Sequence, residues 1–522
     1  MQVALHRILL AAGIGVIVFI PKWVTGLPFS QLLSSDAASW VYQLQKVELE
    51  DKQQVKSNTT KPNTAYYIPQ LRAIIEMGKI TGLSVASISV YMSIFCLIIW
   101  VFTFYEMAKF CLPDPRWAIL PGMLSIIETH ILGGSTLGFR ALGFMPRDLA
   151  SVIALLLVTL YVVGASKRRG ILIISSFVGA GLLFYLYPPQ SVVLFLVLVI
   201  ADVLRKKNIS LILACSVAGY LLVCSHYAVE LVNTSTGGSF IDENIMRARN
   251  KFMLVTGFNQ DSLRYLRRFA VHSLICFVSI KILFDKYKTK PNIVPITYIS
   301  ISGFLLAIIG LIIESNTEYL RLFISRASAY LTIGTLILCT AALSEYVRDK
   351  ITWKRTIVVC GVILALLIQT NLTTLIGYWA QIARDREEIR ALMQMSECIK
   401  RSTGPASLIL VPYTEQKDIA ATVRTYSERE VYACDKEGGV SIVDGKAARE
   451  WNARVQKQNN VLKTSDTATL SKFMFSEKIS YILFRSCDPF GGAAIKSAQF
   501  EIICSNAYFS LIKRRFNEPF DR

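Results

Sequence analysis

The chain has 522 residues, of which 53% are hydrophobic and only 18% are charged. Soluble globular proteins carry about 25% charged residues, and here the charges gather in short clusters and in the last third of the chain, which excludes a single water-soluble domain. The net charge of +19 does not indicate a nucleic-acid partner, because most lysines and arginines of the first 380 residues lie in clusters between apolar stretches, as in the loops of membrane proteins.

Eleven apolar stretches in residues 1–380 predict a polytopic α-helical membrane domain, since a spanning helix needs about 20 apolar residues. The first stretch is followed by Pro21-Lys22-Trp23 rather than by small residues, so we expect a retained helix and not a cleaved signal peptide. The third is the weakest, because it contains Pro121-Gly122. The spans are centred on residues 8–20, 83–104, 117–132, 149–164, 171–187, 191–204, 209–227, 269–284, 293–313, 327–343 and 356–376.

Clusters of basic residues predict the orientation of these spans. With the N-terminus in the cytoplasm, four of the five inner loops contain such a cluster, and the fifth contains Lys109 and Arg116. Cytoplasmic loops are enriched in lysine and arginine, and an odd number of spans then places the C-terminal domain outside the cytoplasm, on the plasma (inner) membrane. The four clusters are residues 167–169, 205–207, 286–290 and 348–355.

Two outer segments, residues 21–80 and 228–268, are longer than ordinary connections and are expected to be functional or disordered. In the first of them, Asp36 follows Ser34-Ser35 and precedes a helical pattern. Two interpretations stay open. Asp36 is either the N-cap of a helix or a catalytic base or metal ligand at the outer membrane surface.

Glu128 and His130 lie near the outer end of the third predicted span. Ionisable groups at membrane depth are costly and often functional, so both are candidate catalytic residues. The alternative is that both side chains reach water at the interface, because Gly133-Gly134 follows directly.

The outer loops between the later spans contain nine arginines and a single lysine, Lys251. Arginine binds phosphate through a planar fork of donors, so these residues are candidates for binding a lipid phosphate. Pairing with nearby carboxylates such as Asp148 and Glu318 is an equally good explanation. The candidates chosen for the phosphate are Arg140, Arg147, Arg264, Arg321 and Arg326; the other four arginines are Arg247, Arg249, Arg267 and Arg268.

Residues 381–522 change in character and predict a water-soluble α/β domain, because helical patterns alternate with short apolar strands. About 140 residues suffice for one hydrophobic core. Helices are expected over residues 381–400 and 446–456. Strands are expected over residues 407–411, 422–426, 430–434, 479–484, 500–504 and 508–514.

Seven of the eleven cysteines fall in or beside the predicted spans, where cysteine is an ordinary apolar residue. The other four belong to the outward-facing domain. They allow two disulfides in any of three pairings, or they stay as buried thiols. These four are Cys398, Cys434, Cys487 and Cys504.

Three passages of the chain form a further pattern. They are Asp36 with the later Tyr66-Tyr67-Ile68-Pro69, the stretch from Gly133-Gly134 through residues 145–150 to Tyr187-Pro188-Pro189, and the α/β domain with residues 424–429 and Glu450-Trp451. With these passages the layout of the chain resembles the GT-C type of integral membrane glycosyltransferase. The first outer segment lacks the paired Asp-Glu or Asp-Asp of that family.

The resemblance implies transfer of a sugar from a polyprenyl-phosphate carrier to a glycan, lipid or protein acceptor among the membrane lipids of the outer face, in polysaccharide biosynthesis of the cell envelope. Asp36 would then be the general base or the ligand of a divalent cation. Three alternatives stay open: a polysaccharide polymerase or ligase that needs no aspartate base, a transporter of lipid-linked glycans, and a non-catalytic assembly protein. The apolar centres of the spans count against the transporter.

Overall fold

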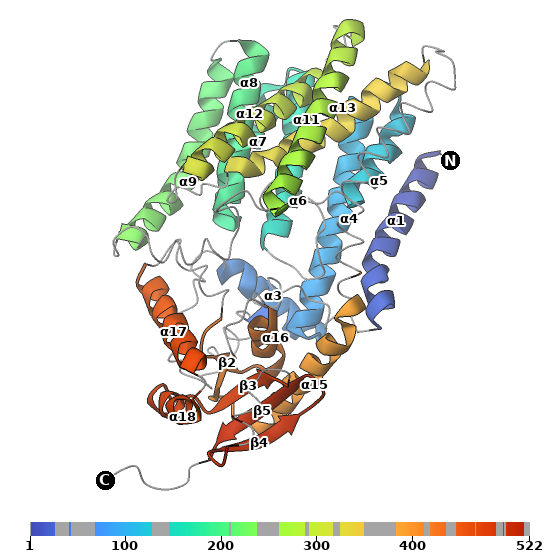
Figure 1. Ribbon diagram of the computed structural model, residues 1–522. Coiled ribbons are helices and arrows are strands. Elements are labelled where there is room, and N and C mark those ends of the chain that lie inside the picture. The colour runs from blue at the N-terminus through green and yellow to red at the C-terminus, as the bar shows by residue number, and fades with distance from the viewer. Residues whose placement is uncertain are drawn as a thin grey trace.

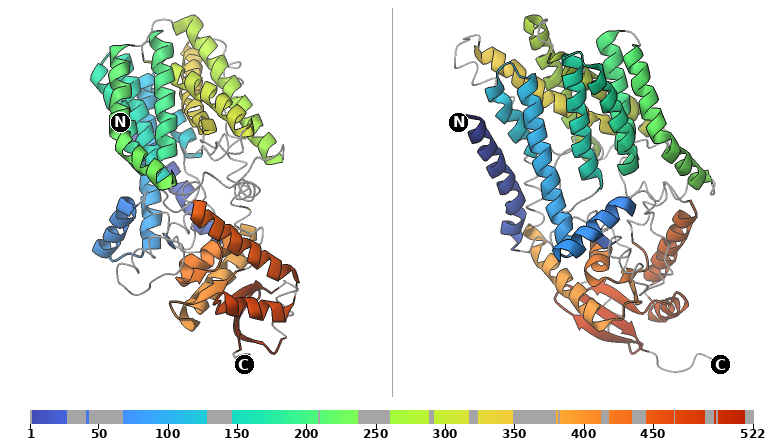
Figure 2. Two further views of the ribbon diagram at one scale, coloured as in Figure 1. Left: turned by 90° about the vertical axis from the view of Figure 1, so that its left-hand side faces the viewer. Right: turned by 180° about the vertical axis from the view of Figure 1, so that it is seen from behind.

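The computed structural model consists of a bundle of long helices and a smaller part in which helices cover a five-stranded sheet (Figures 1 and 2). The sheet lies beyond one end of the bundle and is formed by the last part of the chain. The structure describes residues 2–26, 41–42, 68–127, 146–207, 210–236, 260–287, 292–316, 324–348, 380, 383–411, 418–434, 445–464, 466–486, 494 and 497–515.

Each of the first ten predicted spans overlaps a helix of the bundle, and the eleventh, residues 356–376, lies outside the described residues. The bundle helices are α1 (Gln2–Thr25), α4 (Val85–Cys111), η3 (Pro115–Ala118), α5 (Ile119–Ile127), α6 (Pro146–Ser166), α7 (Gly170–Leu186), α8 (Pro188–Lys206), α9 (Leu211–Thr236), α11 (Gln260–Tyr287), α12 (Val294–Asn316), η4 (Ile324–Ala327) and α13 (Ser328–Arg348). A further helix, α3 (Ile68–Thr81), precedes α4 and lies at the end of the first outer segment.

Five helices among the described residues are long and apolar enough to cross a membrane, by length and composition, and three shorter apolar helices accompany them. The chain is therefore an integral membrane protein, whereas the number of eleven spans stays a prediction. The five apolar segments are Val85–Cys111, Arg147–Ser166, Pro188–Lys206, Val294–Ile313 and Ser328–Glu345.

Short turns fix the direction of the central helices. Residues 167–169 alone separate α6 from α7, and Tyr187 alone separates α7 from α8. Helices joined by so few residues run antiparallel, so α6 begins, α7 ends and α8 begins at the same end of the bundle. The basic residues 167–169 and 205–207 consequently lie together at the opposite end.

The third predicted span contains a proline and a glycine, and both are compatible with the helix found there. Pro121 lies in the first turn of α5, where its missing N–H costs little. Gly122 faces α1, and a Cβ at this position would lie 3.0 Å from the side chain of Leu10. A larger residue here would therefore require the Leu10 side chain to shift.

The C-terminal part is a mixed sheet with the strand order β2-β1-β3-β5-β4. β1 is parallel to both β2 and β3, and β5 is antiparallel to β3 and β4. The strands are β1 (Leu408–Leu410), β2 (Glu430–Val431), β3 (Tyr481–Arg485), β4 (Phe500–Ser505) and β5 (Phe509–Arg514). The helices are α15 (Arg386–Ser402), α16 (Asp418–Ser427), α17 (Gly445–Thr464) and α18 (Thr467–Ser476).

Each face of the sheet has its own hydrophobic core, because side chains alternate along a strand. On β3, Tyr481 and Leu483 pack against α15 and α16, whereas Ile482 and Phe484 pack against α17 and α18. The sheet is thus covered by helices on both faces.

The expected strand over residues 422–426 is wrong, since these residues belong to α16. The β-branched Thr422, Val423 and Thr425 favoured a strand, but packing against α15 outweighs this weak preference. The Thr425 hydroxyl also donates to the Ala421 carbonyl at 2.9 Å, as it does in a helix.

Cys398 on α15 and Cys504 on β4 form a disulfide. Of the other two candidates, Cys434 is a buried free thiol, so a disulfide through it does not exist here, and Cys487 lies outside the described residues. The disulfide ties the first helix of the C-terminal part to the far edge of its sheet.

Candidate functional site

The structure describes the side chains of only some of the residues singled out from the sequence. Arg147 and Arg326 are described, and Arg264 lies on α11 without a described side chain. The others lie outside the described residues, namely Asp36, Glu128, His130, Arg140 and Arg321.

Arg326 lies in η4, directly before α13, and is partly buried. Its Nη1 atom donates a hydrogen bond of 2.7 Å to the hydroxyl oxygen of Tyr187. Tyr187 is the single residue between α7 and α8, and the two prolines after it begin α8, where their missing N–H groups are not needed. The contact therefore sets an arginine at the end of the bundle where α6 and α8 begin.

A buried polar layer lies directly behind this contact. Gln190 on α8 donates from Nε2 to the hydroxyl of Tyr330 on α13 at 3.0 Å. Ser191 donates to the carbonyl of Ala180 on α7, and its hydroxyl lies 3.2 Å from that of Tyr220 on α9. These bonds fix α8 against three neighbouring helices, so the start of α8 is a rigid support for the Tyr187 turn.

Arg147 lies in the first turn of α6, at the same end of the bundle, and is half-buried. A cation at a helix N-terminus is opposed by the helix dipole, and the adjacent Asp148 offsets part of that cost. The Ser151 hydroxyl donates to the Arg147 carbonyl at 2.7 Å. The structure thus places Arg147 and Arg326 at one end of the bundle, and both explanations of Arg147, phosphate binding and ion pairing, remain open.

A second cluster lies at the opposite end of the bundle, on the turn of α8 next to the basic residues. Asp202 is fully buried and lies 2.6 Å from Arg205 Nη2 and 3.8 Å from Lys206 Nζ. The hydroxyl of Tyr161 on α6 donates to the same carboxylate at 3.2 Å. Charged groups inside a membrane domain raise the question of function. Here the Asp202 carboxylate is paired with Arg205 and accepts from Tyr161, so we interpret the cluster as a structural joint between α6 and α8.

A third cluster joins the first outer segment to the C-terminal part. Val41 and Tyr42 are buried, with exposed fractions of 0% and 6%. The guanidinium of Arg424 on α16 lies 4.1 Å from the centre of the Tyr42 ring, and Arg424 pairs with Glu430 on β2 at 3.3 Å. Sequence reasoning did not pair Tyr42 with Arg424, because no local pattern signals a contact between residues so far apart in the chain.

Burial raises the pKa of the Tyr42 phenol well above its usual value, and this effect exceeds the opposing influence of the Arg424 charge. Hydrogen bonding to the Glu430 side chain raises it further. Tyr42 is therefore a neutral donor at physiological pH and cannot act as a base.

Within the part of the chain that the structure covers, no group of three His, Cys, Asp or Glu side chains could hold a metal ion. Asp36, the metal ligand expected from the sequence, lies outside that part.

No protein-family model matches the sequence, and no curated protein matches it. Among solved structures, the chain is similar to ArnT from Cupriavidus metallidurans bound to undecaprenyl phosphate, with 11% identity, a TM-score of 0.54 and 97% of each chain covered. The apo state of ArnT gives 12% identity, a TM-score of 0.55 and the same coverage. The Archaeoglobus fulgidus oligosaccharyltransferase in complex with zinc and sulfate gives 9% identity and a TM-score of 0.45, over 91% of this chain and 68% of that one.

The likeness to ArnT extends over nearly the whole of both chains and shows that this protein has a GT-C-like fold. The resemblance noted from the sequence is thereby confirmed at the level of the fold.

Proposed function

We propose that this protein is a membrane glycosyltransferase that moves a sugar from a polyprenyl-phosphate carrier to a glycan, lipid or protein acceptor at the outer face of the membrane. The observation that carries the proposal is the GT-C-like fold, shared over 97% of both chains with ArnT, whose structure contains undecaprenyl phosphate. The position of Arg147 and Arg326 at one end of the bundle supports it, because arginine is suited to a phosphate headgroup.

In the proposed reaction, a carboxylate takes the proton from the acceptor while the acceptor atom bonds to C1 of the sugar. The bond between C1 and the carrier phosphate breaks, and its electron pair stays on the phosphate oxygen. Cationic side chains near this oxygen stabilise the charge that develops on it. Asp36 is the proposed base, Glu128 and His130 are further candidates, and Arg140, Arg147, Arg264, Arg321 and Arg326 are the proposed phosphate-binding residues.

A divalent cation is a further part of what the fold family implies. Asp36, which lies outside the described residues, is the proposed ligand for it.

The proposal includes the orientation of the chain, with a cytoplasmic N-terminus and residues 381–522 outside the cytoplasm. Two observations support it. The basic clusters 167–169 and 205–207 lie at the end of the bundle opposite to Tyr187, as expected for cytoplasmic loops, and disulfides such as Cys398–Cys504 are typical of oxidising compartments outside the cytoplasm. A reporter fused after Arg522 should be active only outside the cytoplasm, and one fused near Arg168 only inside.

The proposed activity is tested with the purified protein in lipid nanodiscs and a panel of polyprenyl-phosphate sugars. Release of free polyprenyl phosphate, together with label in the acceptor, is the expected result. Asp36→Asn should abolish transfer while the melting temperature stays unchanged, because asparagine caps a helix about as well as aspartate. Full activity of this variant removes Asp36 from the catalytic role and favours a polymerase or ligase that needs no aspartate base.

A further inference from the structure

The C-terminal part contacts the first outer segment through three side chains, Tyr42, Arg424 and Glu430. We infer that Arg424 and Glu430 are positioning residues, which hold the first outer segment through Tyr42 in the place that sugar transfer requires. The inference rests on the proposed function, because in that proposal the first outer segment carries the base Asp36. It gives the C-terminal part a role in the reaction itself, besides binding the acceptor or supporting the fold.

The contact is well suited to hold a segment in one place. Arg424 and Glu430 are 11% and 17% exposed, so their ion pair is largely shielded from water. The Tyr42 ring lies 4.1 Å below the guanidinium, and cation–π contacts are strongest where they are desolvated. The neighbouring Val41 is completely buried. Ring, ion pair and apolar neighbour together define both the position and the rotation of residues 41–42.

The two elements that carry Arg424 and Glu430 are themselves held in place within the C-terminal part. α16, which carries Arg424, packs against α15 in the core that also contains Val423 and Val431. β2, which carries Glu430, pairs with β1 in the sheet. The two partners of Tyr42 therefore cannot move independently of the sheet, and the contact is a rigid anchor rather than a surface ion pair.

A second contact joins the same two parts at the end of α1. Gly26 has a positive φ of +65°, and a Cβ at this position would lie 3.0 Å from Arg390 Nη2 and 3.4 Å from Arg386 Nη2. Two cations next to a helix C-terminus are favourable, because the helix dipole is negative there. The first outer segment thus contacts the C-terminal part at Gly26 and again at Tyr42.

The distance along the chain makes the anchor relevant to Asp36. Asp36 precedes Tyr42 by six residues, and six residues span at most about 20 Å. Holding Tyr42 in place therefore limits how far Asp36 can move, and a displacement of Tyr42 can displace Asp36. A shift of about 1 Å in a reacting group can cost about a hundredfold in rate, which gives the anchor its expected effect.

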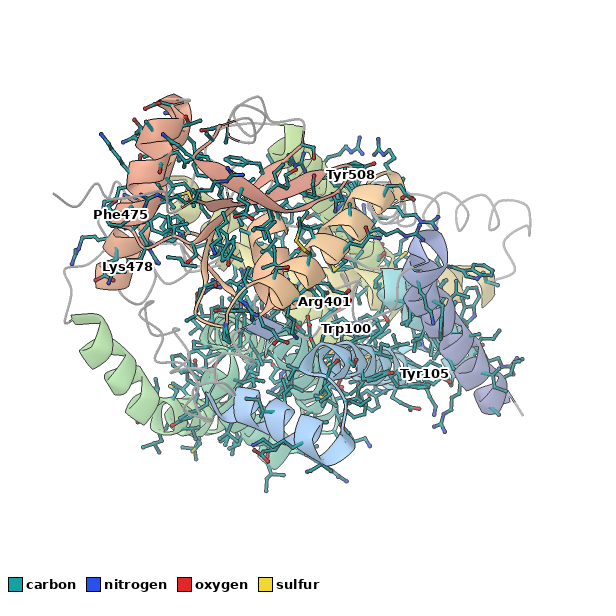
Figure 3. All side chains as sticks on the ribbon, turned by 90° about the horizontal axis from the view of Figure 1, so that it is seen from below. Trp100, Tyr105, Arg401, Phe475, Lys478 and Tyr508 are labelled. Carbon is teal, nitrogen blue, oxygen red and sulfur yellow. A yellow bond between two sulfur atoms is a disulfide. The ribbon has the colours of Figure 1, made fainter. Side chains whose placement is uncertain are left out.

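The first test measures steady-state transfer by full-length variants in nanodiscs. Arg424→Lys keeps the charge but loses the planar group that stacks on the ring and pairs with Glu430, so kcat should fall about tenfold to a hundredfold. KM for the carrier-linked sugar should stay within about twofold, because the phosphate-binding residues are untouched. The kcat of Tyr42→Phe, which keeps the ring, should fall much less than the kcat of Tyr42→Ala. The matched control is Arg401→Ala, since Arg401 is 80% exposed on α15 and, among the described residues, forms its ion pair with a helix neighbour, Glu397 (Figure 3).

The second test needs no activity and uses the buried Val41. In a Val41→Cys variant, a membrane-impermeant maleimide should leave the introduced thiol unmodified, as peptide mapping would detect. Adding Arg424→Ala should make this thiol reactive, whereas adding Arg401→Ala should not.

The outcomes separate the two proposals. If the wild-type protein transfers no sugar from any polyprenyl-phosphate donor, the proposed function is overturned, and the inference about the reaction falls with it even where the labelling shows an anchor. If transfer is observed, the inference is overturned by an Arg424→Ala variant whose kcat stays within about twofold of wild type, or by a thiol at position 41 that stays shielded in the Arg424→Ala background.

Discussion

Arg326 and Tyr187 are 139 positions apart in the chain, yet Arg326 Nη1 donates a hydrogen bond of 2.7 Å to the Tyr187 hydroxyl. The bond connects the start of α13 to the turn between α7 and α8. It orients a guanidinium at the end of the bundle where α6 and α8 also begin. The Tyr187 hydroxyl accepts from one of the five N–H donors of the guanidinium.

The first prediction is that Arg326→Lys weakens binding of a polyprenyl-phosphate donor although the charge is kept. Charge-assisted hydrogen bonds contribute about 1.5–3 kcal/mol, which corresponds to a loss of roughly tenfold to a hundredfold in affinity. Tyr187→Phe removes only the orienting bond and leaves the guanidinium in place, so it should cost less affinity than Arg326→Lys. Donor affinity is measured by titrating the purified protein with the donor. Arg116→Lys is the control, since Arg116 is 74% exposed at the other end of the bundle. Unchanged affinity in Arg326→Lys would exclude Arg326 from the phosphate site.

The second prediction concerns the buried Asp202. Asp202→Asn leaves Arg205, itself only 15% exposed, without its charged partner. Removing one partner of a buried ion pair costs about 3–5 kcal/mol, so the melting temperature in detergent should fall by many degrees. Glu106→Gln is the control, because the ion pairs of Glu106 with Arg7 and Lys109 are exposed and such pairs contribute about 0–1 kcal/mol. Equal melting temperatures for the two variants would show that the Asp202 cluster does not join α6 to α8.

The third prediction concerns the disulfide of the C-terminal part, which closes a loop across a sequence separation of 106. Reduction should lower the stability of this part by about 2–5 kcal/mol, as for natural disulfides in small domains. Cys398→Ser should show the same loss without reductant and no further response to it. Cys434→Ser should keep the full response, because Cys434 is a free thiol. A wild-type protein whose melting does not respond to reductant would contradict the disulfide.

The fourth prediction is that the stability of the protein depends on pH through Glu477. Burial opposes ionisation of this carboxyl, but hydrogen bonds from Lys457 and Tyr432 outweigh it and hold its pKa below the usual value. A depressed carboxyl pKa contributes stability that is present above the unfolded pKa of about 4.3 and is lost as pH falls through the folded pKa. Glu477→Gln should therefore melt lower than wild type at pH 7, and the difference should shrink below about pH 4. The exposed Glu501→Gln serves as control, and a difference that is constant from pH 7 to pH 3 would contradict the prediction.

Much of the fold could be predicted from local patterns, and the exceptions have physical causes. Long apolar stretches predict helices because a membrane leaves few alternatives, and the ten described ones are helical. α18 was not predicted, although Asp466 caps it by accepting bonds from the N–H groups of Ala468 and Thr469. An Asp before a partly apolar run is a helix signal, so this helix could have been found.

The candidate site was less predictable than the fold. The excess of arginine over lysine in the outer loops singled out Arg147 and Arg326, and both lie near helix starts at one end of the bundle. Their role in binding a phosphate stays a prediction. The partners, however, come from distant parts of the chain: Tyr187 for Arg326, and Arg424 for Tyr42. Neither a hydrogen bond nor a cation–π contact leaves a periodic trace in a sequence, so such pairs can be found only once the helices are packed.

The last prediction separates the two explanations of Arg147. This arginine begins α6, where the helix dipole disfavours a cation, so something must compensate. If the compensation is a lipid phosphate bound through two N–H groups, Arg147→Lys should lower the affinity for a polyprenyl-phosphate donor by roughly tenfold to a hundredfold, since charge-assisted hydrogen bonds contribute about 1.5–3 kcal/mol. If it is an ion pair with a neighbouring carboxylate, lysine should replace arginine with little change in affinity, because a point charge suffices for such a pair. The comparison with Asp148→Asn completes the test. Under the phosphate explanation, Asp148→Asn leaves donor binding equal or slightly tighter, because one negative charge near the phosphate is removed. A marked loss of binding would instead show that Asp148 orients Arg147 and that the two residues act as a pair.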